Sequence, residues 1–179
     1  SFGYGATFGA MYDVIDMVTV GFMYSTKQDI ADQEYRVGAN DIYNYQGAVG
    51  KAGTYKMAMD YPSQMALGVK VQPMDGLKIP ADIKQINWSE THDKVDFSGP
   101  SNSFDTTGNK TGDSDKIKLN FGWDDQMVYA LGADYQLLPN LNVRAGYNYA
   151  EAPIDQEDVF NNLVFPATVE QHYSFGATY

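Results

Sequence analysis

Two neighbouring stretches of the chain, residues 126–137 and 141–149, alternate strictly between large apolar residues and small or polar ones. A period of two is the signature of a β-strand, because successive side chains point to opposite faces. One face carries large aliphatics and tyrosines, whereas the other mixes glycine, alanine, amides and charges. A water-soluble sandwich would keep its outer face uniformly polar, so this mixed second face indicates a crowded or wet interior.

The same alternation recurs along the chain and predicts seven antiparallel strands. Their expected spans are residues 2–13, 17–26, 64–73, 77–89, 125–138, 140–150 and 168–179. The four residues from Pro73 to Gly76 have the Pro and Asp-Gly chemistry of a hairpin turn. Near Ile86 the alternation shifts phase, as a β-bulge would make it do.

The connections between the predicted strands alternate in length. They are short after the first, third and fifth strands and long after the second, fourth and sixth, which is typical of outer-membrane barrels. Residues 27–53 are polar and irregular, and residues 92–116 and 151–167 read as loops. An eighth strand would have to come from within residues 29–60, where Tyr43–Tyr45 and Thr54–Met59 are the candidates.

Charge and composition restrict the class of protein. Lys plus Arg number 12 against 23 Asp plus Glu, a net charge of −11, so nucleic acid is not the expected partner. The chain lacks cysteine, which fits an extracytoplasmic protein without proving it. No run of 18 apolar residues exists, but a transmembrane strand needs only roughly 9–11 residues. The 14 tyrosines suit the aromatic girdles of a membrane barrel.

These observations predict an all-β protein, an antiparallel transmembrane β-barrel of the bacterial outer membrane. The chain opens SFGYGATFG, with neither an initiator methionine nor a signal peptide, so we expect a processed protein or a fragment. Seven strands is also an odd number, which an up-and-down barrel does not close neatly.

Four segments, in order along the chain, resemble the long-chain fatty acid outer-membrane transporter (FadL) family. WDDQMVYALGADYQLLPNLNVRAGYNYAEAPI is similar to its penultimate hairpin, and GYGATFGAMYDVIDMVTVGFMYSTKQDI to a mid-barrel hairpin. YPSQMALGVKVQPMDGLKIPADIKQINWSE resembles the strand with a proline and the strand that ends in an aromatic residue followed by serine. FPATVEQHYSFGATY resembles the closing strand.

The resemblance implies the C-terminal half of a 14-stranded barrel, so that residues 1–179 form one barrel segment without the N-terminal hatch and first strands. It implies passive uptake of hydrophobic small molecules, such as long-chain fatty acids or aromatic hydrocarbons. The partners would be outer-membrane lipid, lipopolysaccharide, the hydrophobic ligand and the remaining strands, and no cofactor is expected. The alternative is a structural or adhesive barrel with exposed acidic loops.

Charged residues fall on the face that the alternation assigns to the lumen. One interpretation is that they pair across neighbouring strands, because an unpaired inward charge is costly. The other is that a cation holds the carboxylate of a fatty acid, for which arginine offers a forked donor. We favour pairing. The candidates are Lys70, Lys78, Asp82, Lys84, Asp134, Arg144, Glu170 and His172.

Catalytic and metal sites find little support in the sequence. Ser89, His92 and Asp93 lie close together, but no nucleophile elbow or oxyanion motif accompanies them, so no enzyme is predicted. The acidic group of Asp105, Asp113 and Asp115 does not have EF-hand spacing. Solvated loop residues are the favoured interpretation of that group, with calcium bridging to lipopolysaccharide as the alternative, and no metal site is predicted.

The alternation also predicts which side chains face lipid. The lipid-facing set is Leu67, Leu131, Val143 and Phe175, and the opposite set is Lys70, Asp134, Arg144 and His172. We therefore expect Leu131→Arg to impair assembly much more than Gly132→Ser.

Overall fold

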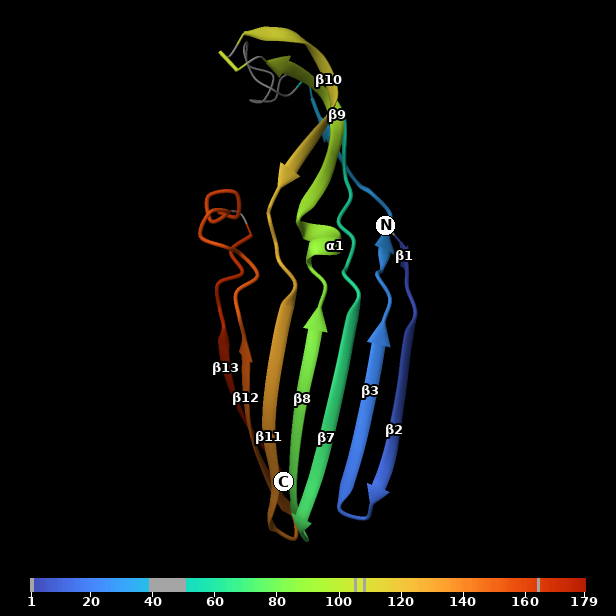
Figure 1. The fold of residues 1–179 in the computed structure, drawn as a ribbon, viewed down its shortest axis with the longest axis vertical. Helices are drawn as coiled ribbons and strands as arrows, with labels where there is room; N and C mark the ends of the chain where they lie inside the picture. The colour runs from blue at the N-terminus through green and yellow to red at the C-terminus, as the bar shows by residue number, and fades with distance from the viewer. Residues whose placement is uncertain (1, 39–50, 105, 108, 164) are drawn as a thin grey trace.

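The computed structural model describes residues 2–38, 51–104, 106–107, 109–163 and 165–179. Seven long strands form one antiparallel sheet with the order β13-β12-β11-β8-β7-β3-β2 (Figure 1). These strands are β2 (Thr7–Ile15), β3 (Val18–Ser25), β7 (Gln64–Met74), β8 (Leu77–Ile86), β11 (Gln126–Leu138), β12 (Leu141–Ala150) and β13 (Gln171–Thr178). The seven predicted wall strands are thus confirmed as one seven-stranded sheet.

Short turns join β2 to β3, β7 to β8 and β11 to β12, all at the lower end of the sheet in Figure 1. In the β7–β8 hairpin Met74 pairs with Leu77, so the turn consists of Asp75 and Gly76. Gly76 has a φ of +79°, which favours glycine. The irregularities of register lie beside these turns. The bulge expected near Ile86 is wrong: β8 ends there, and helix α1 (Ser89–His92) follows.

The first predicted strand is divided in two. The two-residue strand β1 (Gly3–Tyr4) leaves the large sheet and pairs with β4 (Asp29–Ile30). The expected irregularity of residues 27–53 is corrected as well, because it contains β4 and β5 (Gln33–Val37), and β6 (Gly53–Met57) starts at its end.

The loop predicted for residues 92–116 is wrong, because two strands occupy most of it. These strands, β9 (Lys94–Phe104) and β10 (Lys110–Asn120), join a four-stranded sheet with the order β10-β9-β6-β5 that extends beyond the upper end of the wall strands (Figure 1). Alternation arises where one face meets lipid and the other does not. A hairpin outside the hydrocarbon layer is held by its backbone ladder and needs no such pattern.

A small aromatic core holds this outer sheet together. The Tyr55 side chain is buried and stacks on Phe97 with ring centroids 5.3 Å apart. A Cβ atom at Gly99 would overlap the Tyr55 ring, so only glycine lets β9 pass this close. Tyr55 belongs to β6 and Phe97 to β9, so the core joins the connection before β7 to the connection after β8.

The eighth-strand candidates do not add a strand to the wall. Thr54–Met59 overlaps β6, which pairs with β5 and β9 in the outer sheet and not with any wall strand. Tyr43–Tyr45 lies outside the described residues. In the described parts of the chain, β2 and β13 are therefore the two edges of the wall sheet.

The pairing register confirms the predicted partition of faces. Residues directly opposite each other on paired strands share a face. Leu131 pairs with Ala81 and Tyr147, whereas Asp134 pairs with Lys78 and Arg144. We call the first side the apolar face and the second the polar face.

The large apolar side chains of the wall are outside any protein core. Leu67 and Leu131 are 54% and 55% exposed, and Phe175 is 85% exposed. Across the described residues, no helix has the length and apolarity to cross a membrane.

Candidate functional site

The polar face joins residues that are far apart in the sequence. One row runs from Met11 through Gly21 and Gly68 to Asp82, each opposite the next across a strand pair. Further along the sheet, Arg144 on β12 stands opposite Asp134 on β11. The register places five of the candidates predicted from the sequence on this face. They are Lys70, Lys84, Asp134, Arg144 and His172.

Arg144 and Asp134 form the ion pair that cross-strand pairing predicts. Arg144 Nε donates to Asp134 Oδ2 at 2.5 Å, and Arg144 Nη1 donates to Thr178 Oγ1 at 3.0 Å. Asn142 Nδ2 lies 3.4 Å from Asp134 Oδ1. Arg144 thus links β11, β12 and β13. Its guanidinium is engaged within the wall, which favours the structural role for this residue.

Among the described residues, the remaining cations of the polar face form no ion pair. Lys78 lies opposite Asp134 in register, yet Asp134 is paired with Arg144. In the described part of the chain, neither Lys70 nor Lys84 has an ion pair. His172 stands opposite Asn148 near the upper end of β13. A ligand-binding role for any of these groups stays a prediction.

Glu170, also assigned to this face, comes just before β13 begins. Its backbone oxygen accepts a hydrogen bond from Ala150 N at 2.8 Å, and its Oε1 atom accepts a long one from Ala152 N at 3.4 Å. Glu170 therefore helps to join the ends of β12 and β13.

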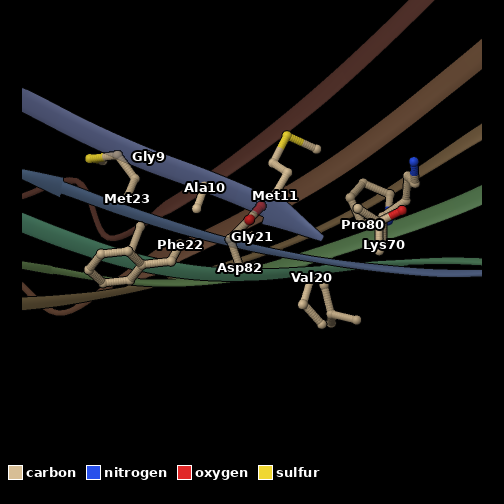
Figure 2. Close-up of a pocket in the computed structure, with 14 residues that line it drawn as sticks. Gly9, Ala10, Met11, Val20, Gly21, Phe22, Met23, Lys70, Pro80 and Asp82 are labelled. Atoms are coloured by element: carbon tan, nitrogen blue, oxygen red, sulfur yellow. The ribbon is translucent and has the colours of Figure 1, made fainter. Parts of the chain in front are cut away.

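A hollow of about 480 Å³ lies over β2, β3, β7 and β8. Its floor is low because Gly21 and Gly68 are paired across β3 and β7 and neither has a side chain. Two methionines rise beside this floor: Met11 stands opposite Gly21, and Met23 stands opposite Gly9. Figure 2 shows Met11 and Met23 on one side of the sheet and Val20 and Phe22 on the other.

Two charged side chains border the same hollow, Lys70 from β7 and Asp82 from β8 (Figure 2). The Asp82 carboxylate lies over Gly68, where a Cβ atom would overlap its Oδ1 atom. Gly21 differs, because a Cβ there would meet nothing closer than Met11 Cγ at 3.8 Å. Sequence reasoning missed this hollow. Its only signal was a set of glycines on neighbouring strands, whose alignment depends on register.

An aromatic cluster lies where the wall strands give way to the upper loops. The rings of Trp88, His92 and Trp123 all contact one another. The His92 centroid lies 4.9 and 5.0 Å from those of Trp88 and Trp123, which are themselves 5.1 Å apart. His92 Nδ1 lies 2.8 Å from Thr91 Oγ1, and Ser89 Oγ donates to Asp125 Oδ1 at 2.7 Å. The residues Ser89, His92 and Asp93, expected in a loop, belong to the single turn of α1 and its C-cap. Their contacts attach the turn of α1 to the segment that holds Trp123 and Asp125.

The acidic group of the long connection was predicted from Asp105, Asp113 and Asp115. Asp105 lies outside the described residues, and Asp113 and Asp115 belong to β10. Within the described residues, no three His, Asp or Glu side chains are grouped to hold a metal ion.

The His92 cluster makes a testable pH prediction. Burial against the two tryptophan rings lowers the pKa of His92 below its ordinary value of about 6.5. The folded state therefore binds this proton less tightly than the unfolded state, so the packing of the cluster is fully stabilising above pH 6.5 and weakens as the pH falls. We expect tryptophan emission to shift to the red between pH 7.5 and pH 5.

Two glutamine variants test which of the two histidines of the chain causes the emission change. His92→Gln should remove this emission change, whereas His172→Gln should leave it in place. The nearby carboxylates are engaged in other contacts, Glu90 with Ser63 and Asp93 with Lys94. An emission change that persists in His92→Gln would contradict the assignment.

A family model described as outer membrane protein transport protein (OMPP1/FadL/TodX) matches residues 1–179. Alkane uptake protein A of Marinobacter nauticus is 36% identical over 96 residues, which cover 52% of this chain and 18% of that protein.

Solved structures show the same fold. The Pseudomonas putida toluene transporter TodX superposes with a TM-score of 0.67 at 22% identity, covering 98% of this chain and 39% of its own. A Pseudomonas aeruginosa FadL homologue gives a TM-score of 0.69 at 19% identity, covering 97% of this chain and 39% of its own. This chain thus spans well under half the length of these relatives. The match over all 179 residues shows that the chain belongs to the OMPP1/FadL/TodX family of outer membrane transport proteins.

Proposed function

We propose that this chain forms part of the wall of a barrel that admits hydrophobic small molecules through the bacterial outer membrane by passive diffusion. Outer-membrane location and the transporter class follow from the family. Its relatives include an alkane uptake protein and toluene transporters, which supports an uncharged or weakly polar hydrophobic substrate.

The two faces of the wall sheet suit this role. The apolar face presents exposed side chains such as Leu67, Leu131 and Phe175, which water would not stabilise but lipid does. The polar face would then line the lumen. A wall sheet of this kind must leave no unpaired backbone toward hydrocarbon, and all five interior strands are paired on both sides.

One observation carries the proposal: the polar face contains a hollow bordered by methionine and glycine, on the side of the wall away from lipid. An adhesive or structural barrel needs no such feature in its lumen. Polar groups around a mostly apolar hollow are the usual composition of a small-molecule site. In this scheme Arg144 and Asp134 stabilise the wall, and Lys70, Lys78 and Lys84 are cations available to a ligand.

The test is uptake by cells with and without the gene. Cells that carry the gene should take up radiolabelled toluene, hexadecane or oleate several-fold faster than deletion cells, and complementation should restore the rate. Uptake of a small hydrophilic solute such as glycerol serves as the control and should not change. The adhesive barrel would be supported instead if deletion cells took up all three hydrophobic compounds as fast as cells that carry the gene, and if deletion also reduced adhesion of the cells to surfaces.

A further inference from the structure

We propose that the hollow over Gly21 and Gly68 is a binding site for an uncharged hydrocarbon, of which a single aromatic ring is the simplest example. The proposal rests on the proposed uptake function and adds the position of a site and the class of ligand that it selects. A volume of about 480 Å³ falls within the range of roughly 300–1,000 Å³ typical of small-molecule sites.

The shape of the hollow follows from where side chains are missing. Gly21 has no side chain, and a Cβ atom there would meet nothing closer than 3.8 Å, so a flat ring can approach its backbone closely. The Asp82 carboxylate lies over Gly68, its partner on β7, and borders this open floor. On the neighbouring strand Met11 is 79% exposed, and its side chain lies beside the floor (Figure 2). Methionine adapts to ligand shape and its sulfur makes favourable contacts with aromatic rings. Met11 and Met23 are therefore suited to hold such a ligand.

The charges at the border disfavour an anion. Lys70 would attract a carboxylate, but Asp82 borders the same hollow and would repel it. The two effects oppose each other, while the cost of removing a carboxylate from water remains. A neutral hydrocarbon avoids this cost and gains from burial of its apolar surface. The hollow should therefore prefer toluene to a fatty acid anion.

The glycines provide a matched pair of variants. Gly21→Leu fills the hollow, and its Cβ atom meets nothing closer than 3.8 Å, so the strand should tolerate it. Gly176→Leu makes the same change on β13, on the same face but far along the sheet, where a Cβ atom has no neighbour within 4 Å. Any general effect of a leucine on the polar face appears in both variants. An effect on the hollow appears only in the first.

The experiment uses the protein purified from the outer membrane, reconstituted in lipid nanodiscs and labelled with ¹³C at its methionine methyl groups. Toluene should shift the Met11 and Met23 signals in a saturable way through its ring current, while Met65 on the apolar face stays as a reference. Gly21→Leu should weaken toluene affinity at least tenfold, and Gly176→Leu should change it less than twofold. Decanoate should not displace toluene.

The outcomes separate this site from the function itself. If cells take up toluene but Met11 and Met23 do not respond, the site is wrong and the uptake function stands. Equal losses in Gly21→Leu and Gly176→Leu, or displacement by decanoate as efficient as by unlabelled toluene, would also overturn the site. If the methionines respond but cells show no uptake of any hydrophobic compound, the proposed function fails while binding is retained.

Discussion

Replacing Leu131 with arginine is expected to reduce the yield of folded protein severely. Leu131 lies in the middle of β11, on the apolar face, between Ala81 and Tyr147. An arginine near the midplane of the lipid-facing side of a barrel costs about 2–4 kcal/mol, because its charge must leave water. The measurement is the fraction that folds in lipid vesicles, followed by the heat-dependent shift of the folded band in gel electrophoresis.

The neighbouring residue supplies the control for this change. Ala130→Arg introduces the same side chain one position away, on the polar face, opposite Asp82 and Asn148. It should fold nearly as well as the unchanged protein. Gly132→Ser should also cost less than Leu131→Arg, although a Cβ at this position lies 3.0 Å from Pro80 Cγ and some adjustment is needed. Similar folded fractions for Leu131→Arg and Ala130→Arg would refute the assignment of faces.

A polypeptide restricted to residues 1–179 is not expected to form a heat-resistant monomeric barrel in detergent. In the described sheet, β2 and β13 each pair on one side only. Their outer edges present unpaired N–H and C=O groups, and in hydrocarbon each unsatisfied group costs several kcal/mol. These edges must find partners. The isolated polypeptide should aggregate, dimerise through its edges, or require further strands supplied in trans.

Light scattering coupled to size-exclusion chromatography measures this directly, with resistance to protease as a second readout. The protein purified from the outer membrane provides the reference for a folded barrel. Addition of a separately expressed segment that supplies the missing strand partners should convert the polypeptide to the folded form. A monodisperse, protease-resistant monomer of residues 1–179 alone would mean that the two edges are already satisfied within this chain.

The sequence by itself determined the wall of the barrel. Each of the seven wall strands repeats a period of two, and that period is a local property of the backbone. Within a single strand, the side that carries the large apolar residues is the one suited to lipid. Leu131 and Asp134 could therefore be assigned to opposite faces without knowing their cross-strand neighbours. The resemblance to the transporter family, borne by the same hairpins, was confirmed by the match over the whole chain.

Only the tertiary structure decided what lies beyond or across the strands. The polar hairpin of β9 and β10 has no alternation to reveal it, because outside lipid its strands are held by backbone pairing and by the Tyr55–Phe97 contact with another connection. The cluster of Trp88, His92 and Trp123 likewise joins residues from the two ends of that connection.

Cross-strand partners also required the fold. Asp134 lies opposite both Lys78 and Arg144, and only the positions of the side chains show that it pairs with Arg144. The hollow exists because the register aligns Gly21 with Gly68 and places Asp82 beside them. A shift of one residue in either strand pair would move these side chains to the opposite face. Alternation assigns each residue to a face, but register, which depends on contacts between distant segments, decides which residues meet there.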